Sequence, residues 1–242
     1  MRANILSQIS FALNRIYTEW YPSRGYDFDI TNNTQFDQSF VQNRDIFDNI
    51  SQLVDEIFND YVRREGNIEP YFTQYCNGTT STCEGLSQWG TVELAEQGLN
   101  SVEILQNYFG DNIEIVNDAP VADNQPSYPG TPLRLGDNGN DVLTKQIQLN
   151  RISRNYPAIP KIETTDGVFA VSTDEAVRAF QRIFGLTEDG IIGKETWYRI
   201  TFLYNSVKRL AELDSEGIAL EDVRKQFSEI LREGDSGDEV RV

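Results

Sequence analysis

The chain has 242 residues, a formal net charge of −17 and no histidine. This length allows one large or two modest domains, and a hydrophobic content of 39% is that of a globular protein. Nucleic-acid backbones and anionic membrane surfaces attract clustered Lys and Arg, so the acidity argues against both partners. It fits a neutral or mixed-charge partner, such as a glycan. No apolar run approaches the ~20 residues of a membrane span.

The absence of histidine limits the possible chemistry. It excludes His-based catalytic triads and the usual His-containing zinc sites, so proton transfer would have to use Asp, Glu, Lys or Tyr. We predict no metal site and no cofactor. The opening residues Met1–Ile5 have neither a long apolar core nor a small-residue cleavage site, so we predict no signal peptide in this chain.

An amphipathic helix of about 20 residues opens the chain, because apolar residues recur at three- and four-residue spacing up to Trp20. Pro22 and Gly25 are expected to end it. No cap precedes it, which suggests that the chain is cut inside an element. The expected face consists of Ile5, Ile9, Ala12, Leu13, Ile16, Tyr17 and Trp20.

The following hundred residues predict a mixture of helices and strands. Ser101 is the expected N-cap of the last helix, with Glu103 in its first turn. Four prolines and no periodicity mark residues 117–132 as a linker. In chain order we expect a strand at 26–30, a helix at 49–62, a strand at 68–75, helices at 91–97 and 101–108, and a strand at 113–116.

Two cysteines, Cys76 and Cys83, enclose a loop rich in glycine and threonine. Three states are open: a disulfide, reduced thiols, or a metal site, although zinc normally takes four Cys or His ligands. In the chain-entropy model a disulfide over so short a loop contributes roughly 2–3 kcal/mol. A disulfide would also imply an oxidising, extracytoplasmic compartment.

The residues directly after this loop are the candidate binding site. Gln88 and Trp89 could line a sugar groove, since aromatic rings stack on glycans; alternatively, Trp89 is a core residue that anchors the loop. Ser87 has no histidine to activate it as a nucleophile. Glu84 is expected to be a solvated loop carboxylate, because raising its pKa would require burial.

From Leu133 onward the pattern predicts a small unit of three helices. The first helix is expected to end near Asn155, and the second to start at Ser172. The third is expected to start near Lys194 and to continue to Leu213. Two Asp-Gly turns, Asp166-Gly167 and Asp189-Gly190, are internal pseudo-repeats in which Gly supplies the positive φ. The spacing places Phe180, Phe184 and Trp197 in the core.

A further acidic helix is expected at Glu221–Arg232. The pattern Leu-Arg-x-Gly-Asp-x-Gly-x-x-Val occurs at Leu133 and again at Leu231, where it stops as its helix should start. The chain therefore looks trimmed at both ends from a longer modular parent.

Residues 133 to about 204 resemble the peptidoglycan-binding domain 1 family. The match is specific, although Lys145 stands where the family usually has Leu, and residues 153–164 lengthen the first loop. The resemblance implies a non-catalytic three-helix module that binds bacterial peptidoglycan. It rests on Leu133-Arg134-x-Gly136-Asp137-x-Gly139-x-Asp141-Val142, Asp166-Gly167-x-Phe169, Thr173-x-x-Ala176-Val177-x-x-Phe180-Gln181 and Leu186-x-x-Asp189-Gly190-Ile191-x-Gly193-x-x-Thr196-Trp197.

Residues 1 to about 116 resemble the second part of the stage II sporulation protein D (SpoIID, LytB-like) family. The matching blocks are 85–90 (Gly-Leu-Ser-Gln-Trp-Gly), 95–98, 103–109, 29–40 and 68–80. Enzymes of this family are lytic transglycosylases, whose catalytic glutamate would lie upstream of Met1. Ile9 and Thr73 stand at the positions of a family arginine and histidine. The resemblance implies glycan contacts by Gln35, Thr80, Ser87, Gln88 and Trp89.

The sequence thus predicts an α/β (α+β) SpoIID-like remnant followed by an all-α peptidoglycan-binding-like domain. The predicted segments are 1–116, a linker at 117–132, the domain at 133–213, and a helix with the start of a second repeat at 214–242. The predicted function is non-catalytic binding of peptidoglycan glycan strands in the cell wall or spore envelope of a bacterium. The alternatives are a lytic transglycosylase with an upstream glutamate, and an assembly protein that uses both modules for protein contacts.

Overall fold

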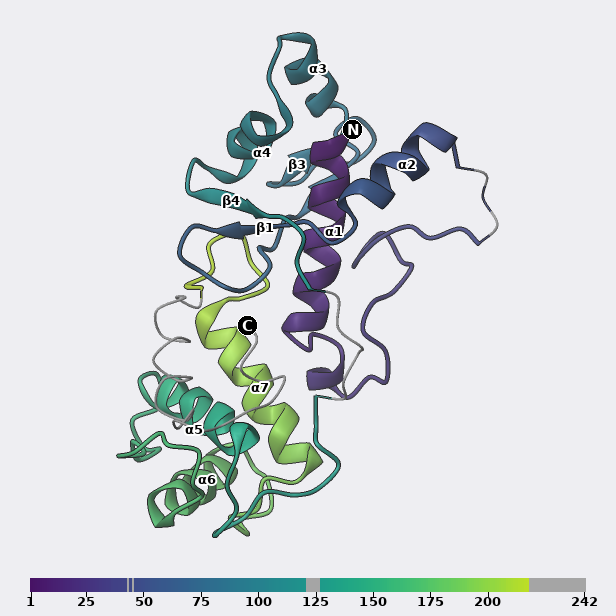
Figure 1. The fold of residues 1–242 in the computed structure, drawn as a ribbon. Coiled ribbons are helices and arrows are strands. Elements are labelled where there is room, and N and C mark those ends of the chain that lie inside the picture. Colours follow the sequence, from purple (N-terminus) through teal and green to yellow (C-terminus); the bar gives the residue numbers. More distant parts are fainter. Residues whose placement is uncertain (43, 45, 121–126, 218–242) are drawn as a thin grey trace. The chain divides into compact units, whose positions relative to one another are not determined.

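The computed structural model describes residues 1–42, 44, 46–120 and 127–217. Its contacts divide these residues into two compact units. The first unit comprises residues 1–22, 26–120 and 209–217, and the second comprises residues 23–25 and 127–208. The described part has seven α-helices and four short strands, all of the strands in the first unit, so a mixed first unit and a helical second unit are confirmed (Figure 1).

The first unit contains two small sheets and four α-helices. Strands β1 and β4 pair antiparallel, and β2 and β3 pair parallel. A 3₁₀ helix, η1 (Pro22–Arg24), follows α1 at a point where the chain leaves this unit. The elements are α1 (Arg2–Tyr17), α2 (Asp48–Ile57), β1 (Tyr61–Arg64), β2 (Tyr75–Cys76), β3 (Leu86–Ser87), α3 (Gly90–Glu96), α4 (Ser101–Phe109) and β4 (Ile113–Val116).

The core of the first unit forms between α1, α4 and β1. Apolar side chains from these elements meet there, and Leu86 of β3 joins them. Burial of such side chains is the main driving force for folding. The buried members are Ala3, Ile5, Leu6, Ile57, Val62, Tyr71, Leu86, Ile104, Leu105, Phe109 and Ile113.

The buried face of α1 is more polar than the sequence pattern predicts. Ile16 and Tyr17, expected on the apolar face, are 44% and 41% exposed. The helix instead buries small polar residues, which hydrogen-bond to the surrounding loops. The Ser10 hydroxyl accepts from Val62 N at 2.8 Å, and Asn14 Nδ2 donates to Pro70 O at 2.9 Å. These bonds offset the cost of burying polar groups. Apolar spacing alone therefore predicted the buried face in part: Ile5 and Ile9 lie at the core as expected, whereas Ile16 and Tyr17 do not.

Several predicted elements of the first unit are corrected by the structure. Residues 26–30 form no strand; Tyr26 and Phe28 pack their rings on Tyr21 at 5.9 and 4.8 Å. Of the strand predicted at 68–75, only Tyr75 lies in a strand, β2. Tyr71 N donates to Val62 O and Gln74 O accepts from Leu86 N, both at 2.8 Å, but these isolated bonds do not make a ladder.

The boundaries of two helices also differ from the prediction. Helix α2 ends at Ile57, and Tyr61 and Val62 belong to β1 instead. The N-cap of α4 is Asn100, not Ser101, and its side chain and that of Glu103 form a capping box. The sequence prediction identified Glu103 but assigned the cap one residue too late.

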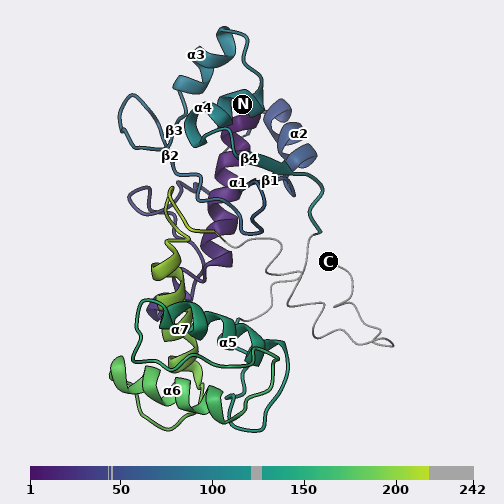
Figure 2. The same ribbon diagram turned by 90° about the vertical axis from the view of Figure 1, so that its left-hand side faces the viewer.

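The second unit is a group of three helices, α5 (Asn140–Ser153), α6 (Val171–Ile183) and α7 (Lys194–Lys208). Figure 2 shows the three helices gathered in one unit. Phe180 and Trp197 are 0% and 4% exposed, which confirms their predicted place in the core. Phe184 is half-buried and packs against Phe180 at 4.8 Å.

The two Asp-Gly turns of this unit are held by two buried glutamines in the same way. Gln146 Oε1 accepts from Gly167 N at 2.9 Å, and its Nε2 donates to Thr173 Oγ1. Gln181 repeats this arrangement on the second turn, where Gly190 N donates at 2.9 Å. The pseudo-repeat predicted from the sequence is therefore a repeated hydrogen-bond arrangement, with Gly167 and Gly190 at positive φ.

Helix α7 ends at Lys208 and does not continue to Leu213 as predicted. Arg209 adopts a positive φ of 56°, which breaks the helix. Residues 209–217 pack with the first unit, where Leu210 is buried and the Leu213 carbonyl accepts from Arg64 Nη2 at 2.7 Å. The predicted helix 221–232 and the second repeat from Leu231 lie outside the described residues.

Candidate functional site

The cysteine-bounded loop connects β2 to β3 in the first unit. Cys76 and Cys83 form a disulfide, so the alternatives of reduced thiols and a metal site are wrong for this structure. Figure 2 shows the loop projecting from the unit beside β2 and β3. The disulfide restricts the conformations of the loop in the unfolded chain as well as in the folded one.

Between the two cysteines, the side chain of Asn77 holds the turn by accepting hydrogen bonds. Its Oδ1 accepts from the backbone N–H groups of Thr79 and Thr80, at 3.2 and 3.1 Å, and from the Thr79 hydroxyl. Gly78 has a φ of 89° and lies against Ser87, and a Cβ at this position would overlap the Ser87 hydroxyl. The loop therefore requires glycine at this position, both for its conformation and for space.

The start of α3 is held against the loop by Ser87 and Tyr108. Ser87 Oγ accepts from Gly90 N at 2.9 Å and is hydrogen-bonded to the Tyr108 hydroxyl. Burial raises the pKa of Tyr108, while the bond to Ser87 opposes this shift. Both hydroxyl groups are thus part of a fixed support, and the chain has no histidine to activate Ser87 as a nucleophile.

The backbone between Ser87 and Gly90 presents its side chains from this fixed support. Gln88 N donates to Cys76 O at 2.9 Å, and Thr91 Oγ1 donates to Gln88 O at 2.7 Å. Trp89 is 56% exposed, so the alternative that it anchors the core is wrong. Gln88 is half-buried, and Thr80 and Glu84 are exposed. The structure thus presents Thr80, Gln88 and Trp89 from one loop and the strand end next to it.

Gln35, the fifth predicted glycan contact, lies on a different segment. It is exposed, and its backbone N–H donates to Asn33 Oδ1 at 2.9 Å. Gln38, three residues further along the same segment, is directed inward, and its Nε2 donates to Gln8 O of α1 at 2.8 Å.

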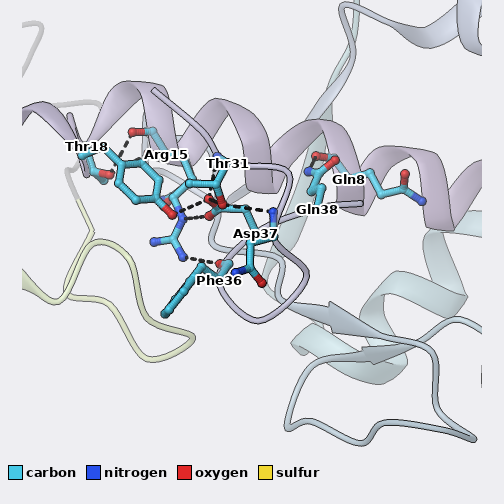
Figure 3. A network of polar contacts seen from close by, with 10 residues as sticks. Gln8, Arg15, Thr18, Thr31, Phe36, Asp37 and Gln38 are labelled. Atoms are coloured by element: carbon cyan, nitrogen blue, oxygen red, sulfur yellow. Dashed lines mark hydrogen bonds and ion pairs between the residues drawn. The ribbon is translucent and has the colours of Figure 1, made fainter. Parts of the chain in front are cut away.

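Sequence reasoning missed a buried network centred on Arg15 and Asp37 (Figure 3). Arg15 Nε donates to Asp37 Oδ1 at 2.9 Å, and the two side chains are 8% and 0% exposed. The other carboxylate oxygen accepts from the Tyr21 hydroxyl and from Thr31 N and Oγ1. An arginine four residues after Phe11 on a largely buried helix face was the available signal, because a buried cation needs a partner.

The charges of this network explain its pKa shifts. Burial by itself would raise the pKa of Asp37, but the hydrogen bonds from Tyr21 and Thr31 and the charge of Arg15 lower it overall. Burial lowers the pKa of Arg15 and raises that of Tyr21. The guanidinium also lies 4.4 Å from the Trp20 ring centroid. Asp37 therefore stays ionised at neutral pH and cannot serve as a proton donor.

Ile9 and Thr73, at which the sequence resemblance predicted departures from a family arginine and histidine, both serve the structure. Ile9 packs against the core of the first unit. Thr73 is fully buried, and its hydroxyl donates to Ser7 O of α1 at 2.8 Å. Within the described residues, no group of three or more His, Cys, Asp or Glu side chains is placed to hold a metal ion.

In the second unit, the loops that precede the helices are paired with one another. Leu133 forms an antiparallel bridge with Ile192, and Asn138 forms one with Val168. Most of the aromatic rings lie inside the unit, whereas three apolar side chains of these loops and of the first turn of α6 are exposed. Leu135, Val168 and Val171 are 56%, 45% and 63% exposed.

One departure from the predicted helical core is a buried lysine. Lys145 is 1% exposed, and its Nζ donates to Thr201 Oγ1 at 2.8 Å and to Gln148 Oε1 at 2.9 Å. The same Nζ lies 3.6 Å from the Trp197 ring centroid, so the charge faces the electron-rich side of the indole. Lys145 is thereby a structural group of the α5–α7 interface.

Comparison with known proteins identifies the class of the second unit. Residues 138–200 match the family model described as "Putative peptidoglycan binding domain". This range includes all of α5 and α6 and the first half of α7. This match supports a peptidoglycan-binding module in the second unit, and with it an association with the cell wall.

Among solved structures, a crystal structure of the N-terminal domain of SleB is similar to this chain. The two are 31% identical; the match covers 34% of this chain and 99% of that one, with a TM-score of 0.27. No curated protein matches the chain. Within the described residues, no helix is both long enough and apolar enough to cross a membrane.

Proposed function

We propose that this chain is a non-catalytic peptidoglycan-binding protein of a bacterial cell wall or spore envelope, and that both of its units contact glycan strands. The observation that carries the proposal is the match of residues 138–200 to the peptidoglycan-binding family model. The disulfide supports an oxidising, extracytoplasmic location. A net charge of −17 suits neutral sugar rings better than polyanionic partners.

In the second unit, we place the contact with peptidoglycan on the paired loops. Leu135 and Val168 are exposed on two loops joined by backbone hydrogen bonds, and Gly136 N donates to Phe169 O at 2.9 Å. The glutamine-held turns make these loops rigid, so little conformational entropy is lost on binding. Exposed apolar side chains between fixed polar backbone groups suit the mixed surface of a sugar and its acyl substituents.

In the first unit, we place the contact at Thr80, Ser87, Gln88 and Trp89. The exposed indole of Trp89 offers a flat face for a sugar ring, and Gln88 beside it offers an amide for sugar hydroxyl groups. The disulfide and the Ser87–Tyr108 bond support this surface. Gln35 is a further candidate from its exposed segment. The SpoIID-like resemblance of this unit, and with it a link to sporulation, belongs to the same proposal.

Two observations support the absence of catalysis. The chain has no histidine that could activate Ser87, and the hydrogen bonds from Tyr21 and Thr31, together with the charge of Arg15, lower the pKa of Asp37 and keep it ionised. Ile9 and Thr73 serve packing and a backbone hydrogen bond. The alternative of a lytic transglycosylase requires a glutamate upstream of Met1. Release of soluble muropeptides from sacculi by this chain would favour that alternative over ours.

Co-sedimentation with purified peptidoglycan sacculi tests the proposal. We expect the wild-type chain to pellet with sacculi, and Trp89→Ala to pellet with an affinity lower by about tenfold, or about 1.4 kcal/mol. Phe58→Ala is the matched control, because Phe58 is 55% exposed and lies away from the stapled loop in sequence. Recovery of the wild-type chain in the supernatant at all sacculus concentrations would sink the proposal.

A further inference from the structure

The stapled loop, residues 76–83, adds no side chain to the core of the first unit. The four side chains 79–82 are all exposed, and no residue of the loop belongs to the apolar core. Its internal hydrogen bonds are those of Asn77 Oδ1 and one bond from Gly78 N to Ser81 O at 2.8 Å. Hydrogen bonds of an exposed turn compete with water and contribute little net stability. The disulfide is therefore the main constraint on the conformation of this loop.

The first two residues of the stapled loop are the backbone partners of the proposed glycan contacts. Cys76 O accepts from Gln88 N at 2.9 Å, and Asn77 O accepts from Trp89 N at 3.1 Å. The orientation of Gln88 and Trp89 thus depends on where Cys76 and Asn77 lie. An opening of the loop that displaces these two carbonyl groups removes both bonds.

The rest of the first unit is anchored independently of the disulfide. Leu86, three residues after Cys83, is fully buried in the core, and its N–H donates to Gln74 O at 2.8 Å. The core between α1, α4 and β1 contains no residue of the loop. A disulfide removes entropy from locally open states of a loop as well as from the unfolded chain. Loss of the disulfide therefore favours opening of the loop while the core remains folded.

The disulfide lies where a small thiol can reach it. Cys76 and Cys83 are half-buried, and Thr82 and Glu84 on either side of Cys83 are exposed. Thiol–disulfide exchange requires that a thiolate attack one of the two sulfur atoms. The chain has no other cysteine, so a dithiol reductant changes this one bond and no other.

We propose that the Cys76–Cys83 disulfide is a redox switch for glycan binding by the first unit. This inference rests on the proposed function of Gln88 and Trp89. In the switching step a dithiol reductant supplies two electrons and two protons, the S–S bond breaks, two cysteine thiols form, and the dithiol becomes a disulfide. The reduced loop opens, and a glycan must then order Gln88 and Trp89 when it binds, which lowers the affinity.

The switch acts on one unit only. Both cysteines lie in the first unit, and the second unit contains none. A reducing environment therefore lowers the affinity of the chain for peptidoglycan without abolishing it. An oxidising compartment outside the cytoplasm keeps the chain in the form with full affinity.

Co-sedimentation of the full chain with sacculi, with and without dithiothreitol, tests the switch. We expect reduction to lower the affinity of the wild-type chain by about tenfold, the same factor as Trp89→Ala. Trp89→Ala should lose little further affinity on reduction, because the contact that depends on the loop is already gone. The double variant Cys76→Ser with Cys83→Ser should bind like the reduced wild-type chain and should not respond to the reductant.

Hydrogen exchange separates local opening of the loop from unfolding of the unit. The Gln88 and Trp89 amides, whose acceptors are Cys76 O and Asn77 O, should exchange faster in the reduced chain. The amides of β1 and β4 should stay protected. Unchanged exchange at Gln88 and Trp89 would overturn the switch, as would loss of protection in β1 and β4, since the change would then not be local.

The sacculus measurement distinguishes a failure of the switch from a failure of the proposed function. Equal affinity of the oxidised and reduced wild-type chain, with weaker binding by Trp89→Ala, would overturn the switch and leave the glycan contact in place. Recovery of the oxidised wild-type chain in the supernatant would contradict the proposed function itself, and the switch with it.

Discussion

The two units bury their polar side chains in different ways. The second unit uses one arrangement twice, with Gln146 and Gln181 each holding an Asp-Gly turn. The first unit uses single solutions along α1, where Ser10, Asn14 and Arg15 each bond to a different segment. Repetition makes the second unit recognisable from a short sequence pattern, whereas each contact of the first unit depends on a distant residue.

The units also differ in where they keep their aromatic rings. All eight aromatic side chains that are at least 38% exposed among the described residues lie in the first unit. The second unit buries Phe169, Phe180 and Trp197 almost completely. The unit that matches the peptidoglycan-binding family model therefore exposes few aromatic rings, and the exposed rings lie in the unit that this match does not cover. The exposed aromatic side chains are Tyr17, Tyr26, Phe28, Phe36, Phe40, Phe47, Phe58 and Trp89.

The largest effect is expected from Arg15→Met. Removing one partner of a buried ion pair leaves Asp37 uncompensated, which costs about 3–5 kcal/mol. Native-state hydrogen exchange should show this loss in the α1 amides and no change in the α6 amides of the second unit. Arg63→Met is the matched control, because its partially exposed pair with Glu114 is worth about 0–1 kcal/mol. Equal losses for the two variants would contradict the role of the network.

The same pair predicts acid sensitivity of the first unit. The pKa of Asp37 is lower in the folded protein than in the unfolded chain, so its contribution to stability is complete above the ordinary aspartate pKa of about 4. This contribution is lost as the pH falls through the lower, folded pKa. Urea midpoints measured across this acid range should fall more steeply for the wild-type chain than for Asp37→Asn. Parallel slopes would show that Asp37 does not titrate as described.

Removal of the disulfide is expected to have the next largest effect on stability. Cys76→Ser with Cys83→Ser should destabilise the first unit by about 2–3 kcal/mol, because the unfolded chain regains the entropy of the closed loop. The measurement is urea unfolding of the oxidised wild-type chain and the double variant. A mass change on treatment with reductant and an alkylating agent provides the control for the oxidised state. An unchanged midpoint would mean that the staple does not constrain the unfolded chain.

Loss of one glutamine clamp should destabilise only the second unit. Gln181→Leu leaves the buried backbone N–H groups of the second turn without an acceptor, at a cost of about 1–3 kcal/mol. Gln146→Leu should give a similar loss at the first turn. Native-state hydrogen exchange of the α6 and α7 amides measures the loss of stability in both variants. A loss in only one variant would contradict the equivalence of the two turns.

The smallest effect is expected from Lys145→Leu. The substitution removes two hydrogen bonds and the contact with Trp197, but it also removes the cost of burying an ammonium group. We expect a net change within about 1 kcal/mol, together with a shift in Trp197 fluorescence. Thermal unfolding measures the stability. A loss of several kcal/mol would make the lysine a required part of the core.

The sequence predicted the second unit better than the first for a physical reason. The Asp-Gly turns and the spacing of Phe180 and Trp197 are local signals, and all of them are found in the structure. In the first unit, Arg15 pairs with Asp37 across 22 positions, and Asn14 bonds to Leu210 O across 196. Such partners cannot be read from local periodicity.

The candidate site was predicted in part. The disulfide was favoured by the short spacing of the only two cysteines, and the structure contains it. The exposure of Trp89 could not be derived, because a loop tryptophan can anchor a core or face solvent with the same sequence. The backbone bonds of Gln88 to Cys76 and Thr91 decide this outcome, since they fix the direction of the strand end.

The most direct test of the central claim is amide chemical-shift mapping of the full chain with soluble peptidoglycan fragments. The account predicts saturable shifts in two places, the paired loops near Leu135 and Val168 and the stapled loop near Trp89. Absence of saturable shifts, or shifts restricted to residues outside both loop groups, would contradict the proposal that the two units bind peptidoglycan together.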